Sequence, residues 1–194
     1  MNFIKEEFAT TLEVKQSKFI AHLIPFSQYQ SKLVVLKKEH PKARHFVVAY
    51  RYLNEYEQIV EYSSDDGEPS GTSGKPSLMV LQGQGLINAA VIVVRYFGGT
   101  KLGTGGLVRA YSDALNAVVA SAELFEYKKE VMIEVVFDYG AVRLVEYECE
   151  KLAINIVEKI FDLQVQYVLK APKENLDKLC LLSSLNSISH IPHR

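Results

Sequence analysis

A cluster of glycines in the stretch RYFGGTKLGTGGLVR, residues 95–109, constrains the fold more than any other feature of the chain. Glycine occupies five of the nine positions from Gly98 to Gly106. Because glycine destabilises helices and strands, such a cluster needs either an unusual backbone path or a ligand close to the main chain. The apolar residues 87–97 before it predict a strand buried on both faces, and residues 105–123 after it predict a long amphipathic helix.

The glycine-rich loop has the properties of an anion-binding site. Free amide groups and the positive end of the helix dipole converge at a helix N-terminus, and glycine lets an anion approach the backbone. Thr104 is placed to cap the helix, and the first turn contains no acid, although acids are favoured there. The residues that we predict to bind an anion or a nucleic acid are Arg95, Gly98, Gly99, Lys101, Gly103, Thr104, Gly105, Gly106 and Arg109.

An alternative is that these glycines permit tight packing and that Lys101 and Arg109 pair with acids such as Asp113. The loop matches neither of the two best-known phosphate-binding patterns. It lacks the Gly-Lys-Ser/Thr ending of a P-loop and the glycine spacing of a dinucleotide fingerprint.

A second loop, SDDGEPSGTSGKPSL at residues 64–78, contains three glycines, two prolines and four serines, which predicts irregular structure. Its carboxylates and hydroxyls are ligands that a hard cation accepts, but their order is not that of a known calcium loop. We therefore favour an exposed turn-rich loop over a metal site. The candidate residues of this loop are Asp65, Asp66, Glu68, Ser70, Thr72, Ser73 and Lys75.

Periodicity predicts the remaining elements and two domains of α+β class, 1–128 and 129–194. In the first half, Ser27 and Gln30 form a capping box at the start of a helix. The elements expected there are two strands within 8–26, a helix over 27–40, a hairpin of 45–53 and 58–63, and a short helix over 78–84. The elements expected in the second half are a strand over 131–138, a helix over 141–153, a hairpin of 155–161 and 164–170, a helix over 173–185 and a strand over 187–191. This βαββαβ order is that of a ferredoxin-like domain.

Composition narrows the function. The 194 residues carry a formal net charge of −1, so anion binding has to come from a local patch rather than from bulk charge. No apolar run reaches the roughly 18 residues of a membrane-spanning helix. The sequence shows no metal-ligand spacing, no nucleophile motif and no aromatic RNA-binding signature. We expect a cytoplasmic protein without a cofactor, a metal or a preference for DNA, and we assign no catalytic residue.

Two segments, YSSDDGEPSGTSGKPSL and VVRYFGGTKLGTGGLVRAYSDA, resemble the signatures of the IMPACT/YigZ family. They occur in the family's order and at about its separation, and Ser73 stands where alanine is more common. The resemblance implies that the residues of both loops form the family's signature surface. It extends to the second half of the chain, because the bacterial branch carries a ferredoxin-like C-terminal domain.

The resemblance also implies a relation to translation. The family's N-terminal domain is similar to domain IV of elongation factor G and to a ribosomal small-subunit protein domain, in a fold shared with the GHMP kinases. The C-terminal domain is similar to domain V of the same factor. Eukaryotic relatives act in translational control, and the resemblance implies contact with RNA or the ribosome for bacterial members.

Three functions are consistent with these features. We favour a non-catalytic, translation-associated regulator that binds RNA or the ribosome through the electropositive glycine-rich loop. One alternative is an enzyme of GHMP-kinase-like fold that acts on a small molecule or nucleotide with magnesium. The other is a protein–protein adaptor in translational control, in which the loops form a rigid rim.

Overall fold

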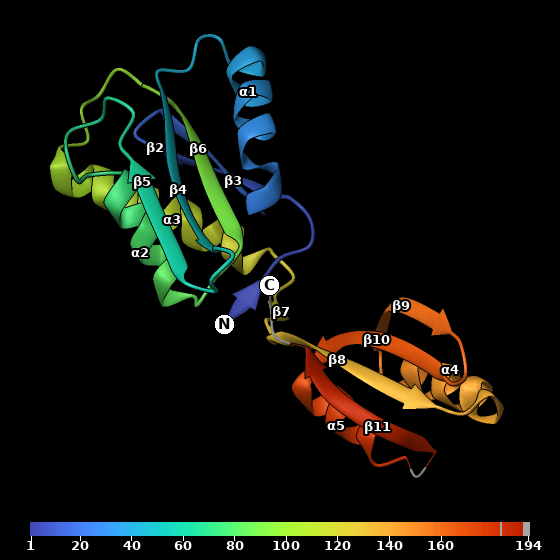
Figure 1. The fold of residues 1–194 in the computed structure, drawn as a ribbon. Coiled ribbons are helices and arrows are strands. Elements are labelled where there is room, and N and C mark those ends of the chain that lie inside the picture. Colours follow the sequence, from blue (N-terminus) through green and yellow to red (C-terminus); the bar gives the residue numbers. More distant parts are fainter. Residues whose placement is uncertain (183, 192–194) are drawn as a thin grey trace. The chain divides into compact units, whose positions relative to one another are not determined.

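The computed structural model describes residues 1–182 and 184–191 and divides into two units, Met1–Tyr127 and Lys128–Arg194 (Figure 1). Residues 192–194 of the second predicted domain lie outside the described residues. Each unit has its own sheet, helices and hydrophobic core, so the predicted two-domain α+β class is confirmed. Within the described ranges, no helix is long and apolar enough to cross a membrane.

Unit 1 is built on a five-stranded antiparallel sheet with the order β2-β3-β6-β4-β5. Its central strand β6 is buried on both faces, as its apolar sequence predicts. A short antiparallel pair, β1 and β7, joins the two ends of the unit. The strands of unit 1 are β1 (Asn2–Phe3), β2 (Phe8–Val14), β3 (Ser17–Pro25), β4 (His45–Leu53), β5 (Ile59–Ser64), β6 (Ala89–Tyr96) and β7 (Phe125–Glu126).

Helices cover both faces of this sheet (Figure 1). On one face lie α2 (Gly74–Gly83) and α3 (Thr104–Ala120), and on the other lies α1 (Tyr29–Glu39). The apolar stripe predicted for α3 is confirmed, because Leu107, Tyr111 and Leu115 are buried in the core. The glycine-rich loop therefore connects the end of the central strand to the start of the longest helix.

The start of β4 lies beside the end of β6. The two strands are antiparallel, with His45 opposite Arg95. The amide of Arg44 also donates a hydrogen bond to the carbonyl oxygen of Arg95 over 3.0 Å. Residues that precede β4 are thus held next to the glycine-rich loop, although about fifty positions separate them in the sequence.

Unit 2 has the predicted βαββαβ order in a four-stranded antiparallel sheet, β11-β8-β10-β9. Both helices share one core with the sheet, through Val145 and Cys149 of α4 and Leu176 and Leu179 of α5. This arrangement is the ferredoxin-like one. The elements are β8 (Glu130–Phe137), α4 (Val142–Lys151), β9 (Asn155–Phe161), β10 (Val165–Pro172), α5 (Lys173–Cys180) and β11 (Leu185–Ile191).

The predictions for α1, α2 and α5 are each wrong in one detail. The irregular loop predicted to reach residue 78 ends earlier, because α2 begins at Gly74 and tolerates Pro76 in its first turn, where no amide donor is needed. The predicted capping box is absent, since α1 follows a 3-10 turn and has no side-chain cap. Helix α5 ends at Cys180 and not at residue 185, because a turn precedes β11.

Candidate functional site

Gly98 brings the glycine-rich loop against the turn between β2 and β3. A Cβ atom at this position would lie 2.0 Å from the carbonyl carbon of Gln16 and 2.2 Å from the amide nitrogen of Ser17. The Gly98 amide donates a hydrogen bond to Ser17 Oγ over 3.1 Å. This glycine therefore serves close packing, which is the role that the alternative interpretation gives to the whole cluster.

Gly99 and Gly103 instead allow the backbone of the loop to adopt a left-handed conformation. Their φ angles are 87° and 73°, in the left-handed region that side chains avoid. Gly103 precedes the first turn of α3, and no side chain caps the helix, so the prediction that Thr104 caps it is wrong. The amides of residues 104–106 have no acceptor in the described part of the chain, and the first turn contains no acid. Unpaired donors thus remain at the positive end of the helix dipole.

Asp65 holds the second loop in shape. Its Oδ1 accepts hydrogen bonds from the Ser73 amide at 3.1 Å, from Ser73 Oγ at 2.7 Å and from the Gly74 amide at 2.7 Å. Its Oδ2 accepts one from the Gly71 amide at 2.8 Å. Burial acts to raise the pKa of Asp65, but these hydrogen bonds outweigh it and hold the pKa below its usual value. Asp65 is therefore an anchor for the loop and for the start of α2.

Glu68 and Arg95 form a buried ion pair between the two loops. Arg95 Nη1 donates to Glu68 Oε1, and the Tyr111 hydroxyl donates to the same oxygen over 2.8 Å. Glu68 is only 8% exposed and Arg95 only 5%. Removal of either partner would therefore leave the other charge buried and uncompensated, which destabilises the fold. Burial, and then the negative charge of Glu68, raise the pKa of Tyr111, which keeps its hydroxyl protonated as a donor.

The aromatic rings of Phe19 and Phe97 complete the setting of Arg95. The guanidinium carbon lies 5.3 Å from the centroid of the Phe19 ring and 5.8 Å from that of Phe97. Cation–π contact adds to the ion pair at such distances. Arg95 therefore has a fixed orientation, with its charge balanced by Glu68.

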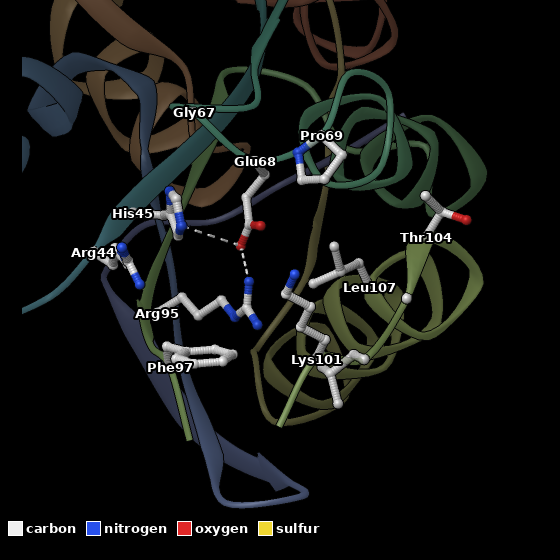
Figure 2. Close-up of a pocket in the computed structure, with 12 residues that line it drawn as sticks. Arg44, His45, Gly67, Glu68, Pro69, Arg95, Phe97, Lys101, Thr104 and Leu107 are labelled. Atoms are coloured by element: carbon white, nitrogen blue, oxygen red, sulfur yellow. Dashed lines mark hydrogen bonds and ion pairs between the residues drawn. The ribbon is translucent and has the colours of Figure 1, made fainter. Parts of the chain in front are cut away.

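The two glycine-rich loops meet at a pocket of about 450 Å³. Figure 2 shows the side chains of Arg95 and Lys101 directed toward this cavity and Arg44 at its edge beside His45, whereas the hydroxyl of Thr104 is turned away. The pocket is lined by Arg44, His45, Gly67, Glu68, Pro69, Arg95, Phe97, Lys101, Leu102, Gly103, Thr104 and Leu107.

The pocket is electropositive. Three of its lining side chains are cationic and one is a carboxylate. Glu68 balances Arg95, but Arg44 and Lys101 have no ion pair with any residue that the structure describes. His45 donates from Nδ1 to the carbonyl oxygen of Asp66 over 2.8 Å, and its Nε2 lies 3.9 Å from Glu68 Oε1. Two positive charges are thus uncompensated before any charge on His45 is counted.

The structure brings only part of the predicted site to this pocket. From the first set, Arg95, Lys101, Gly103 and Thr104 line it, and from the second set only Glu68 does. The predicted residues that do not line it are Gly98, Gly99, Gly105, Gly106, Arg109, Asp65, Asp66, Ser70, Thr72, Ser73 and Lys75.

Arg109 and Asp66 are two examples of predicted residues that do not line the pocket: the first is exposed, and the second has a structural role. Arg109 is exposed on α3, and the pairing with Asp113 that the alternative interpretation expects is not observed among the described residues. Asp66 Oδ2 accepts a hydrogen bond from the Phe46 amide over 2.6 Å and so has a structural partner. In the described chain, no group of His, Cys, Asp and Glu side chains is arranged to hold a metal ion.

Seven lining residues were not predicted from the sequence. Two of them, Gly67 and Pro69, flank Glu68 in the second loop. Phe97 and Leu102 lie within the glycine-rich stretch, and Leu107 begins the apolar stripe of α3, so their position next to the candidates was a usable signal. Arg44 and His45 carried no such signal. Their place at the pocket follows from the register between β4 and β6, which no local pattern encodes.

Comparison with known proteins relates this chain to one family. The sequence profile described as the Impact N-terminal domain matches residues 15–119, a range that contains both glycine-rich loops. A protein of Haemophilus influenzae described as an IMPACT family member is 35% identical over 168 residues, which cover 85% of this chain and 82% of the relative. The Escherichia coli IMPACT family member YigZ is 43% identical over 107 residues, which cover 54% of this chain and 52% of YigZ.

A solved structure extends the likeness to both units. A crystal structure described as that of a hypothetical protein superposes with a TM-score of 0.69 at 26% sequence identity. The match covers 100% of this chain and 98% of the other. The likeness therefore includes the ferredoxin-like unit, which lies beyond the matched N-terminal domain.

Proposed function

The chain belongs to the IMPACT family, and from that premise we propose that it is a non-catalytic, translation-associated protein that binds RNA, free or within the ribosome. The association with translation rests on the role of the eukaryotic relatives that the resemblance implies. The binding surface is the pocket between the two glycine-rich loops together with the start of α3. In the alternative form of this role, the same surface binds a protein partner and acts in translational control through that partner.

One observation carries the proposal: two uncompensated cations, Arg44 and Lys101, stand at a pocket beside the unpaired amides of residues 104–106. Amides at a helix N-terminus and cationic side chains are the groups that bind phosphate oxygens in nucleic acids. Arg109 adds a third exposed cation on the first turns of the same helix. With a net charge of −1, the chain has no bulk attraction for RNA, so affinity depends on this patch.

The magnesium–nucleotide enzyme has less support from the same loops. That function needs carboxylates whose oxygens are available to the metal ion. Asp65 accepts four hydrogen bonds, Asp66 accepts one from the backbone, and Glu68 is shared by Arg95 and Tyr111. The acids of the second loop thus support the shape of the pocket, and we propose no catalytic role for them.

The test is RNA affinity as a function of salt. We expect Lys101→Ala and Arg109→Ala each to weaken binding of a single-stranded oligoribonucleotide and to lower the slope of log K against log salt by about one. Both side chains are exposed, so neither change disturbs the core. Fluorescence anisotropy of the full chain over a series of salt concentrations measures both quantities.

Lys38→Ala is the matched control, because Lys38 is an exposed lysine of α1 that does not line the pocket. It removes the same charge and should leave affinity and slope unchanged. If the Lys101 and Arg109 variants bind like the parent, the proposal is wrong. A loss of a co-purified protein partner in these variants, with no RNA affinity in the parent, would favour the adaptor instead.

A further inference from the structure

We infer that the pocket between the two glycine-rich loops binds a phosphate monoester, the group that stands at a phosphorylated end of an RNA chain. This inference rests on the proposed function and deepens it, since it specifies which phosphate of the RNA enters the pocket. The exposed cations around the pocket bind the internal phosphates of the strand.

The charge of the pocket fits a dianion. An internal phosphodiester carries one negative charge, whereas a monoester carries about −1.5 to −2 at pH 7. Arg44 and Lys101 are the two lining cations without an ion pair in the described chain. A phosphodiester would neutralise only one of them. A monoester neutralises both and leaves the internal pair of Glu68 and Arg95 intact.

Arg95 offers the donors for such a group. Its Nη1 is occupied by Glu68, but its Nε is buried and has no hydrogen-bond partner. Nη2 makes no hydrogen bond to a described residue. Nε and Nη2 together form the side-on edge of a guanidinium, which binds two oxygens of a phosphate at once. A buried donor without an acceptor is costly, and Arg95 lines the pocket, so a phosphate oxygen bound beside the guanidinium would relieve this cost.

The environment of Arg95 fixes that edge in advance. Glu68 is held by the Tyr111 hydroxyl at 2.8 Å, and the guanidinium is in cation–π contact with the rings of Phe19 and Phe97. A guanidinium that is already oriented loses less conformational entropy when it binds. The buried ion pair is therefore a positioning device for the free edge of Arg95.

The size and walls of the pocket indicate what the phosphate is attached to. The volume of about 450 Å³ exceeds the needs of a phosphate group alone. Leu102 and Leu107 provide apolar surface, and the ring of Phe97 is 40% exposed. Exposed aromatic rings stack on bases of single-stranded RNA. The remaining space thus fits the sugar and base of a terminal nucleotide.

The experiment compares ends of one oligoribonucleotide on the full-length chain. Strands with a 5′-phosphate, a 3′-phosphate or only hydroxyl ends, each labelled away from the tested end, are titrated by fluorescence anisotropy. We expect a phosphorylated end to bind at least about tenfold more tightly than a hydroxyl end. Arg44→Ala and Lys101→Ala should abolish this preference, whereas the control Lys38→Ala should keep it.

Competition with a nucleoside monophosphate and with inorganic phosphate identifies the source of the group. If the monophosphate binds to the parent but not to Lys101→Ala, and no RNA binds, the pocket chemistry holds and the RNA function fails. If all RNA ends bind equally while Lys101→Ala still weakens each of them, the RNA function holds and the inference is wrong. Absence of both phosphate competition and RNA binding overturns both.

Discussion

Both units contain the same succession of side chains, but only unit 1 buries the ion pair that ends it. A phenylalanine packs edge-to-face on a tyrosine, the tyrosine hydroxyl donates to a glutamate, and the glutamate pairs with a cation. The ring centroids are 5.1 and 5.0 Å apart in units 1 and 2, and the hydroxyl distances are 2.8 and 2.9 Å. The members are Phe19, Tyr111, Glu68 and Arg95 in unit 1, and Phe137, Tyr167, Glu146 and Lys159 in unit 2.

The two ion pairs differ in their exposure to solvent. The side chains of the Arg95–Glu68 pair are 6% and 3% exposed, and those of the Lys159–Glu146 pair are 42% and 40% exposed. Water and salt screen the second pair and replace either partner when it is lost. The first pair has no such replacement. The ion pair therefore lies at the surface in unit 2, whereas in unit 1 it positions a charge at a pocket.

The largest expected effect comes from Glu68→Gln. The change keeps the shape of the side chain but leaves the Arg95 charge buried without a counter-charge. We expect a loss of about 3–5 kcal/mol in the free energy of unfolding of unit 1. Urea denaturation followed by tyrosine fluorescence measures the loss, and peptide-level hydrogen exchange assigns it to unit 1.

Glu146→Gln is the matched change in unit 2. Its pair is exposed, so we expect a cost of no more than about 1 kcal/mol. Equal losses from the two substitutions would remove the contrast between the units, because burial would then not decide the worth of the pair.

A smaller effect concerns Gly98, where the glycine-rich loop meets the turn between β2 and β3. Gly98→Ala places a Cβ atom against the backbone of Gln16 and Ser17, which we expect to cost about 1–3 kcal/mol. Gly140 is the counterpart in unit 2, because among the described residues no atom beyond its chain neighbours lies within 4 Å of a Cβ built there. Gly140→Ala should change stability by less than about 0.5 kcal/mol. Thermal melting of both variants tests the pair, and a neutral Gly98→Ala would show that the loop does not need this close approach.

The smallest expected effect on stability comes from Tyr167, whose titration at alkaline pH leaves stability at neutral pH unchanged. Burial, and then the hydrogen bond to Glu146, raise the pKa of Tyr167 to about 12 from an ordinary value of 10.0. A raised pKa means that the folded state favours the protonated phenol. This contribution to stability is therefore present below about pH 10 and is lost as the pH rises toward 12.

The absorbance of tyrosinate checks this prediction as the difference between the parent and Tyr167→Phe. In Glu146→Gln the titration should move to lower pH, because the negative charge beside the phenol is gone. Tyr111 should titrate later than Tyr167, since it is buried against a buried carboxylate. Titration of Tyr167 near pH 10 in the parent would contradict the expected coupling to Glu146.

Local patterns predicted most of the fold. The apolar run of β6 and the stripe of α3 identified both elements, because burial on two faces or on one leaves a distinct period in the sequence. The start of α2 was missed for a non-local reason. Its first amides are satisfied by Asp65, nine positions before Gly74, in a loop whose composition predicts no helix.

The aromatic side chains of unit 1 are a second case in which local patterns did not predict contacts between distant residues. The sequence contains no aromatic RNA-binding signature, yet the structure places the rings of Phe26, Tyr29, Tyr52 and Tyr62 around Tyr50 on the face of the sheet that α1 shares. The ring of Phe26 stacks on that of Tyr52 at 4.1 Å, and the ring of Tyr50 stacks on that of Tyr62 at 5.0 Å. These rings meet only because β4 pairs with β5 and because the chain before α1 folds over that face.

The sequence by itself determined the strands of the two larger sheets, most of the helices, the two-domain α+β class, the family and the glycine-rich loop. Each of these depends on neighbouring residues or on a motif that can be read locally. Only the tertiary structure decided which charges remain uncompensated. Glu68 neutralises Arg95 across 27 positions, and the register of β4 on β6 delivers Arg44 to the pocket. Such pairings follow from strand register and burial, which couple distant segments and leave no periodic trace along the chain.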